Sequence, residues 1–312
     1  MGYDAARVRV PPSPRCHLVE APIVEAPDVQ CRDQRHVHDL GRLINENMQA
    51  YWFSFGSTSA GTVFDDGELA WSYTGGPYLN RVTRINLDET DADRRIEETH
   101  QHFGEHGAAV TRLVTPTSRP MDLAQRLQGH NCTLQERWLG MAADPRDIDL
   151  SPIDSTSLRI ADLDGNSDLR AWSALVGEVY QLPTAARATM YRFFTEEAAE
   201  VGDHWRHYLA FDGNTPVATA TLFLGSRTAG IYLVSTHPQY QRRGFGRALT
   251  AYAARDAMAR GYDLIVLQAT EEGKGLYERL GFKGIHVIDA YRWAPSSFPQ
   301  RLRRFLSNKL PQ

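Results

Sequence analysis

Residues 241–247 read Gln241-Arg242-Arg243-Gly244-Phe245-Gly246-Arg247. An apolar, β-branched run precedes them and an apolar-periodic segment follows, which predicts a strand, a loop and the start of a helix. Gly244 and Gly246 lack a Cβ, so an anion can approach the backbone where the N–H groups of the loop and first helical turn point outward. The arginines and the helix dipole add positive potential. The stretch therefore predicts a pyrophosphate-binding loop.

Two other nucleotide-binding loops use glycine in a similar way, and the residues argue against both. A dinucleotide fingerprint, G-x-G-x-x-G, needs a third glycine where this chain has Leu249. A Walker loop needs Gly-Lys followed by Ser or Thr, which is absent from this stretch. Because paired glycines also serve ordinary tight turns, a second motif is needed to identify the loop.

The second motif reads Gly275-Leu276-Tyr277-Glu278-Arg279-Leu280-Gly281-Phe282. With both motifs in this order, residues 155–292 resemble the GCN5-related N-acetyltransferase (GNAT) superfamily. That family's acyl-CoA motif is Gln/Arg-x-x-Gly-x-Gly/Ala, and its later ending is Leu-Tyr-x-x-x-Gly-Phe. Pro238 stands upstream of the loop, as in many members. The sequence departs from the family at Gln268-Ala269-Thr270, where many members have an asparagine.

The resemblance implies acetyl-CoA or another acyl-CoA as co-substrate, and it assigns roles to specific residues. Backbone groups of Leu233, Val234 and Ser235 would pair with the pantetheine arm. The pyrophosphate would be held by Gln241, Arg242, Arg243, Gly244, Phe245 and Gly246, beside Arg247. Tyr277 would protonate the departing coenzyme A thiolate. The alternative for Tyr277 is an aromatic side chain placed only by packing.

An amine nucleophile must be neutral to attack, so transfer also requires a base or a chain of waters. The candidates are Glu178, His237, Glu271 and Glu272. We name Glu178, because it lies at the expected bend between two helices where this family shapes its acceptor pocket. For each candidate, a solvated surface side chain is the alternative.

The predicted elements follow the same order twice along the chain. The first half is expected to have a helix at 36–50, strands at 62–64, 69–73 and 81–87, a helix at 91–106, a strand at 108–114 and a short helix at 120–128. The second half is expected to have a strand at 157–160, helices within 168–199, strands at 207–211, 217–223 and 230–234, a helix at 245–260, a strand at 263–268, a short helix at 274–280 and a strand at 284–288. A tight hairpin is expected at Asp212-Gly213-Asn214.

This repetition predicts an α+β fold with two GNAT-like α/β domains in tandem, each a mostly antiparallel twisted sheet flanked by helices. The expected parts are an N-terminal arm (1–30), a degenerate GNAT-like domain (31–150), a catalytic GNAT domain (151–295) and a basic tail (296–312). The first domain is called degenerate because the segment at the position of the pyrophosphate loop has no glycine and is acidic. It reads Leu87-Asp88-Glu89-Thr90-Asp91-Ala92-Asp93. Its carboxylates would repel a pyrophosphate and its short helix has no tyrosine, so it should shape the structure or the acceptor site.

Composition narrows the range of partners. The chain has 312 residues with 34 basic and 38 acidic side chains, a net charge of -4 that argues against nucleic acid or an anionic membrane as main partner. The first residues lack a secretory signal and no stretch is long enough to span a bilayer, so a cytoplasmic location is expected. Cys16, Cys31 and Cys132 fit neither a disulfide framework nor a zinc motif.

The sequence thus predicts direct transfer of an acetyl or other acyl group to a primary amine of a small molecule or peptide, without a metal. His100, His102 and His106 are interpreted as a solvated helix face. A longer-chain or carrier-bound donor is an alternative, since the basic tail at 301–309 could dock an acyl carrier protein. A non-catalytic acyl-CoA sensor is another. Acceptor identity and oligomeric state stay open.

Overall fold

The computed structural model describes residues 29–151, 158–163 and 166–296, and the strands in these ranges form one twisted sheet. Its eleven strands run in the order β1-β2-β3-β4-β11-β5-β10-β9-β8-β7-β6. The strands are β1 (Thr62–Asp65), β2 (Leu69–Tyr73), β3 (Asn80–Ile85), β4 (Val110–Val114), β5 (Thr133–Ala143), β6 (Leu158–Asp162), β7 (Trp205–Asp212), β8 (Thr215–Leu224), β9 (Ala229–Thr236), β10 (Ile265–Ala269) and β11 (Lys283–Trp293). Only the β3–β4 and β9–β10 pairs of this sheet are parallel, which confirms the α+β, mostly antiparallel class.

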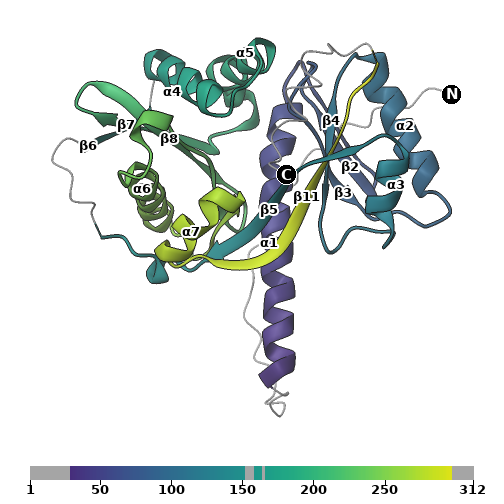
Figure 1. Cartoon of the computed structure of the whole chain (residues 1–312), viewed down its shortest axis with the longest axis horizontal. Helices are drawn as coiled ribbons and strands as arrows, with labels where there is room; N and C mark the ends of the chain where they lie inside the picture. Colours follow the sequence, from purple (N-terminus) through teal and green to yellow (C-terminus); the bar gives the residue numbers. More distant parts are fainter. Residues whose placement is uncertain (1–28, 152–157, 164–165, 297–312) are drawn as a thin grey trace.

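Helices cover both faces of the sheet (Figure 1). They are α1 (Val29–Gly56), α2 (Ala92–Glu105), α3 (Leu123–Gly129), α4 (Asn166–Val179), α5 (Thr184–Arg192), α6 (Phe245–Ala259) and α7 (Glu271–Leu280). In the second half, α6 and α7 bury one face, while α4, α5 and the aromatic end of α1 bury the other. In the first half, α2 and α3 cover one face and α1 the opposite one. The two halves therefore share α1 as a central support.

The predicted duplication is confirmed by two matching units. In the first half, β3 and β4 are parallel and joined by α2, and α3 follows. In the second half, β9 and β10 are parallel and joined by α6, and α7 follows. The predicted hairpin is also present, because β7 and β8 are joined through Gly213, whose φ of 61° few other residues adopt readily.

The predicted end of the first half at the short helix was wrong, because another strand follows that helix. A long strand, β5, follows α3 and lies in the sheet between β11 and β10. Strand β11, from the end of the second half, lies between β5 and β4 and also extends to Trp293, beyond the predicted limit of residue 288. Each half thus contributes its last strand to the junction, and the sheet is continuous.

The first helix is also longer than predicted, spanning Val29–Gly56 in place of 36–50. Its last turns carry Tyr51 and Phe55, both almost fully buried among the aromatic side chains under β7–β9. The predicted helical stretch 168–199 is divided at Gln181–Pro183 into α4 and α5. The expected N-terminal arm up to residue 28 and the basic tail from residue 297 lie outside the described residues.

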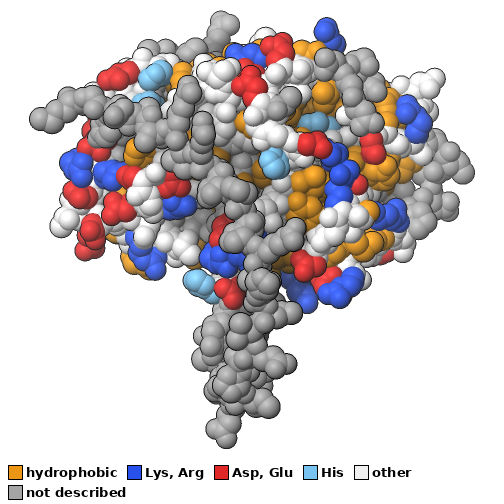
Figure 2. Space-filling view, turned by 180° about the vertical axis from the view of Figure 1, so that it is seen from behind, with side chains coloured by type: hydrophobic (Ala, Val, Ile, Leu, Met, Phe, Trp, Pro, Cys, Tyr) orange, Lys and Arg blue, Asp and Glu red, His pale blue; other side chains and the backbone are white. Residues whose placement is uncertain are grey.

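The surface carries charges of both signs. Basic and acidic side chains are interspersed over the face drawn in Figure 2, in keeping with the small net charge. Of the helices described, none combines the length and apolar composition that a membrane crossing requires.

Candidate active site

The predicted pyrophosphate loop joins β9 to α6. Gly244 precedes the helix with a φ of 86°, and Arg242 also has a left-handed backbone, with a φ of 61°. The first backbone bond of the helix is donated by Ala248 to the Gly244 carbonyl. Within the described chain, the N–H groups of residues 242–247 donate to no backbone carbonyl. They form a turn of free donors at a helix N-terminus, the arrangement that binds phosphate groups.

Gly246 leaves room beside this turn. A Cβ added there would lie 3.6 Å from Leu276 Cδ2 and 3.6 Å from Thr236 Oγ1, which are ordinary contact distances. Packing within the protein therefore does not require glycine at this position. The missing side chain leaves the backbone at this turn open to the approach of a ligand.

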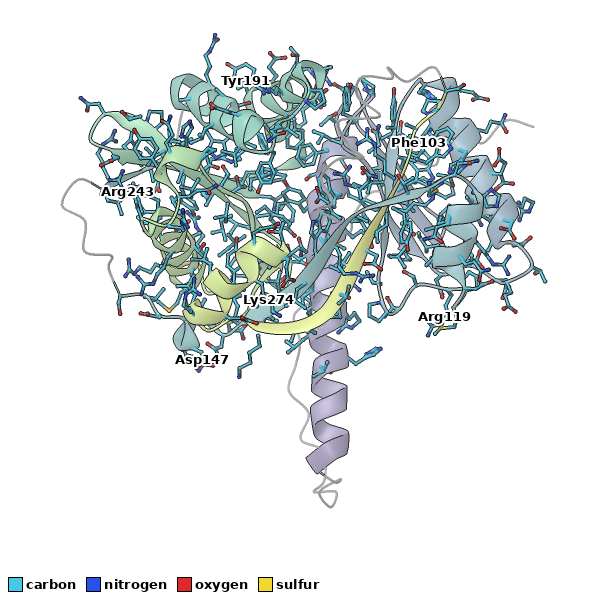
Figure 3. All side chains as sticks on the ribbon, in the orientation of Figure 1. Phe103, Arg119, Asp147, Tyr191, Arg243 and Lys274 are labelled. Atoms are coloured by element: carbon cyan, nitrogen blue, oxygen red, sulfur yellow. The ribbon has the colours of Figure 1, made fainter. Side chains whose placement is uncertain are left out.

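The arginines of the loop differ in their availability. Arg243 pairs with Asp212 at 2.8 Å, and Arg247 pairs with Asp149 at 2.7 Å. Figure 3 shows Arg243 at the outer edge of the second half. Arg242 is exposed and forms no ion pair with a described residue. Only Arg242 is thus free to face an anion without first leaving a carboxylate partner.

A gap between β9 and β10 leads from this loop into the sheet. The two strands are paired only up to Ile231 and Leu267, after which β10 stays with β5. Strand β9 continues beside β8 to Thr236, with a bulge at Leu233, whose φ is 51°. From Tyr232 to Thr236 the edge of β9 toward β10 has no strand partner. The predicted pantetheine contacts, Leu233, Val234 and Ser235, lie on this open edge.

Tyr180 reaches the same edge, which the sequence analysis did not predict. Its hydroxyl donates to the Val234 carbonyl at 3.2 Å. Tyr180 directly follows the last residue of α4, so the end of this helix positions the phenol beside the edge of β9. Burial, then the nearby Glu136 carboxylate, raise the pKa of Tyr180. Since Tyr180 and Val234 are 54 residues apart, no local sequence signal pointed to this contact.

Tyr277 lies on α7 with its ring buried against Phe282. Its hydroxyl makes no hydrogen bond with a described residue, although the ring is only 8% exposed. Burial, then the neighbouring Tyr180, raise the pKa of Tyr277, so the phenol stays protonated at neutral pH. A protonated phenol without a protein partner is in the state that proton donation requires.

Glu178 and His237, two of the candidate bases, are brought together by the fold. Glu178 Oε1 lies 3.3 Å from His237 Nε2, and His237 Nδ1 accepts from the Gln239 N–H at 3.3 Å. His237 follows the end of β9, three residues beyond Val234, which is about 10 Å along a strand. The pair therefore lies on the pyrophosphate side of the gap. Glu271 and Glu272 are exposed in the first turn of α7 and are not brought to this pair.

A carboxylate of the first half, Glu136, faces the second half. It lies on β5 and accepts from Trp138 Nε1 at 2.8 Å. Besides acting on Tyr180, its charge partly offsets the effect of burial and of Arg292, which together lower the pKa of Arg81 to about 10. Arg81, on β3, also stacks over Trp52 of α1 at 4.0 Å. Glu136 was missed because β5 itself was not predicted.

Two carboxylates of the acidic loop in the first half form internal ion pairs. Asp91 pairs with Arg94 at 3.1 Å, and Asp93 binds both Arg126 and His130. Helix α2 begins here without the glycine-rich turn that precedes α6. The loop accordingly offers carboxylates where the second half offers free N–H groups.

Comparison with known proteins agrees with this geometry. Residues 203–284 match a family model described as an acetyltransferase (GNAT) domain. A GCN5-related N-acetyltransferase from Kribbella flavida is similar in structure, with a TM-score of 0.62 at 20% identity, covering 81% of this chain and 94% of that one. A tandem GNAT protein from the clavulanic acid biosynthesis pathway has a TM-score of 0.53 at 14% identity, covering 78% and 85%. No curated protein matches the sequence.

A third solved structure, a conserved protein of unknown function from Staphylococcus epidermidis ATCC 12228, has a TM-score of 0.60 at 12% identity, covering 77% of this chain and 94% of that one. The chain has the tandem GNAT fold. The match to the GNAT domain model at residues 203–284 lies in the second half and includes both the glycine loop and Tyr277.

Proposed function

We propose that the second half transfers an acyl group, most simply acetyl, from acyl-CoA to a primary amine. Three observations carry this proposal: the free N–H groups at Gly244, the unpaired edge of β9, and the hydroxyl of Tyr277, whose neighbour Tyr180 is bound to that edge. Together they define the proposed path. The path offers donors for a pyrophosphate, backbone groups for a pantetheine arm and a proton donor for a thiolate. No metal takes part in this proposed reaction.

In the proposed reaction the amine nitrogen attacks the thioester carbonyl and the C–S bond breaks from the tetrahedral intermediate. Tyr277 donates its proton to the departing sulfur. The amine loses a proton to a base, for which the structure offers two carboxylates. Glu178 stays a candidate through its pair with His237, and Glu136 is added because its charge acts on Tyr180, next to Tyr277.

The acceptor would bind at the junction of the two halves. Tyr180 and Tyr277 come from the second half, while Glu136 and Arg81 come from the first. This arrangement gives the first half a role in shaping the acceptor site, as proposed for a domain without its own pyrophosphate loop. The small-molecule or peptide nature of the amine, and the cytoplasmic setting, stay predictions from the sequence.

Calorimetric titration with acetyl-CoA tests the proposal, using wild-type protein and Gly246→Glu. A Cβ fits at Gly246, and the helix dipole stabilises a carboxylate in the first turn of α6, so the variant should fold. Its charge should repel the pyrophosphate and weaken binding at least about 100-fold, an energy of about 2.7 kcal/mol.

The matched control is Gly129→Glu at the end of α3, where an added Cβ meets nothing within 4 Å. It should bind acetyl-CoA as the wild type does. A panel of amines, with release of free coenzyme A as readout, then identifies the acceptor. Absence of binding by the wild type, or equal binding by Gly246→Glu, would show that the proposed path does not hold acetyl-CoA.

A further inference from the structure

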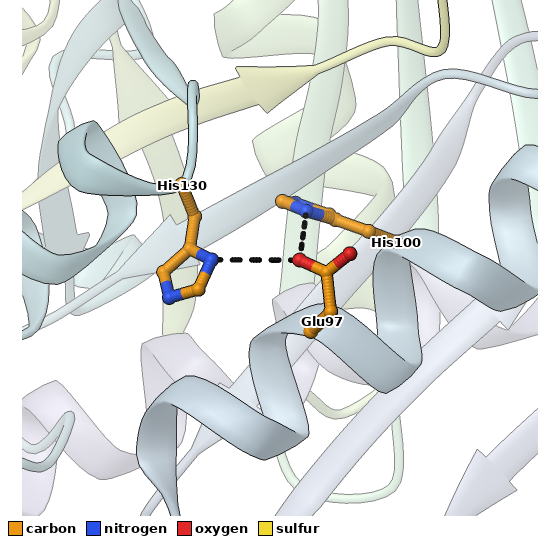
Figure 4. Close-up of side chains that lie close together, drawn as sticks. All are labelled: Glu97, His100 and His130. Carbon is orange, nitrogen blue, oxygen red and sulfur yellow. Dashed lines mark ion pairs between the residues drawn. The ribbon is translucent and has the colours of Figure 1, made fainter.

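Three potential metal ligands of the first half converge on one point (Figure 4). Glu97 and His100 lie one turn apart on α2, and His130 follows α3. Glu97 Oε2 is 3.7 Å from His100 Nδ1 and 3.5 Å from His130 Nδ1. All three ligand atoms lie within 4.8 Å of one another. We propose that Glu97, His100 and His130 bind one Zn²⁺ ion.

The spacing of the three atoms suits a tetrahedral ion. Zinc binds nitrogen and carboxylate oxygen at about 2.0–2.1 Å, so two ligands of a tetrahedron lie about 3.3–3.4 Å apart. The two distances to Glu97 exceed this by only a few tenths of an ångström. The three ligand atoms as a group lie within 4.8 Å of one another, so at least one of the side chains must turn toward the ion when it binds. Two histidines and one carboxylate, with a fourth position for water, are a common zinc ligand set.

Both histidine rings are held by partners on their other nitrogen. His130 Nε2 lies 2.9 Å from Asp93 Oδ1, and Asp93 is itself bound by Arg126. His100 Nε2 lies 3.6 Å from Cys132 Sγ. The His100 ring also stacks on Trp293, with 4.2 Å between the ring centroids and 9° between the ring planes. Outer partners of this kind fix the tautomer and the orientation of metal-binding histidines. Here they direct Nδ1 of each ring toward Glu97.

The charges around the cluster are mixed, because the carboxylates of Glu97 and Asp93 favour a cation and the buried guanidinium of Arg112 opposes one. In the described part of the chain, Glu97 forms ion pairs with the two histidines and with no Lys or Arg. The buried guanidinium of Arg112 lies close by, but it contacts Cys132 Sγ and the Ile96 carbonyl. His100 is almost buried, His130 is one quarter exposed and Glu97 is largely exposed. The open side faces solvent, which allows an ion to enter and a water to complete its coordination.

The position of the cluster points to a structural ion. The ion would join α2 to the segment after α3, and His100 packs on Trp293 at the end of β11. Zinc would thereby hold the helical layer of the first half against the strand that the second half contributes. This inference does not depend on the proposed acyl transfer.

Zinc uptake by protein dialysed against a chelator tests the site, with a chromophoric chelator as competitor. The wild type should bind one ion per chain at micromolar or lower concentration. Glu97→Gln and His130→Gln, both at accessible positions, should weaken binding at least 100-fold. His106→Gln is the matched control, because His106 is the C-cap residue of the same helix and lies outside the cluster. The melting temperature of each zinc-free variant should equal that of the zinc-free wild type, which shows that the fold is kept.

Cobalt substitution then examines the ligand set. Tetrahedral Co²⁺ bound by two imidazoles and a carboxylate should show d–d absorption without a thiolate charge-transfer band. A strong thiolate band would assign Cys132 or another cysteine as ligand and overturn the proposed set. Absence of zinc uptake by the wild type, or unchanged uptake by both ligand variants, would overturn the site itself.

Discussion

At the scale of residues, burial has two opposite effects on Tyr277 as a proton donor. Its ring is buried, as expected for a side chain placed by packing, yet its hydroxyl has no partner among the described residues. The packing role and the acid role are compatible, because burial fixes the ring and leaves the phenol protonated. The same burial raises the pKa of the phenol and makes it a weaker acid, so the proposed donation requires a basic acceptor such as the departing thiolate. The neighbouring Tyr180 hydroxyl is already bound to Val234, so the two tyrosines differ in availability.

Replacement of Tyr277 by Phe should lower kcat for transfer at least about 100-fold while the dissociation constant of acetyl-CoA changes by less than about threefold. The phenyl ring keeps the packing, and only the proton donor is lost. Steady-state kinetics and calorimetry measure the two quantities. Tyr240→Phe, in the loop before the glycines, is the control and should leave kcat unchanged. Equal kcat for Tyr277→Phe and wild type would leave Tyr277 with a packing role alone.

At the scale of elements, the central helix α1 fixes the strand that borders the proposed site. Asn47 donates to the Thr228 carbonyl at 2.8 Å and accepts from the Tyr232 hydroxyl at 2.7 Å. The contact requires glycine in β9, because a Cβ at Gly230 would lie 2.1 Å from Asn47 Oδ1 and 2.4 Å from Tyr232 Cε2. The position of β9 relative to β10 thus depends on a helix more than 180 residues earlier in the chain.

Gly230→Ala should lower the free energy of unfolding by about 1–3 kcal/mol, because the added methyl group displaces Asn47 and Tyr232. Urea denaturation measures the change. Gly129→Ala is the control, since nothing lies within 4 Å of its added methyl group. Alanine is also a better helix former than glycine, so this change should not destabilise α3. A stability equal to the wild type for Gly230→Ala would show that α1 does not constrain β9.

At the scale of the whole molecule, the exchange of β5 and β11 joins the two halves into one sheet. Strand β11 pairs with β4 through residues 289–293 and with β5 over most of its length. Ile288 is fully buried in the core formed with α1 and with Leu113 of β4. Neither half keeps a complete sheet without the other, so we expect the halves to unfold together.

Ile288→Ala should lower stability by about 2–5 kcal/mol through the cavity it leaves. Hydrogen exchange should show the same loss of protection in β2–β3 and in β7–β8, although Ile288 contacts neither pair directly. Val287→Ala is the control, because Val287 is 45% exposed on the same strand. Loss of protection confined to one half would show that the shared sheet does not couple their unfolding.

The sequence alone determined the features that depend on neighbouring residues. The glycine loop, the helix after it, the hairpin at Gly213 and the repeated order of elements all follow from local backbone requirements and apolar periodicity. The same local evidence identified the GNAT motifs, and it located Tyr277 within the second of them. Among the long strands, only β5 was not predicted, because its sequence around Glu136 and Arg137 has no regular alternation of apolar and polar residues.

Tertiary structure decided everything that joins distant segments. Strand β5 is stable because β10 and β11 supply its hydrogen bonds, and Arg137 meets Asp289 across 152 residues. The pairs Glu178–His237 and Tyr180–Val234, and the cluster of Glu97, His100 and His130, likewise combine residues from separate elements. Short-range propensity carries no information on such contacts. They are fixed by burial of the shared core and by the sheet that both halves complete.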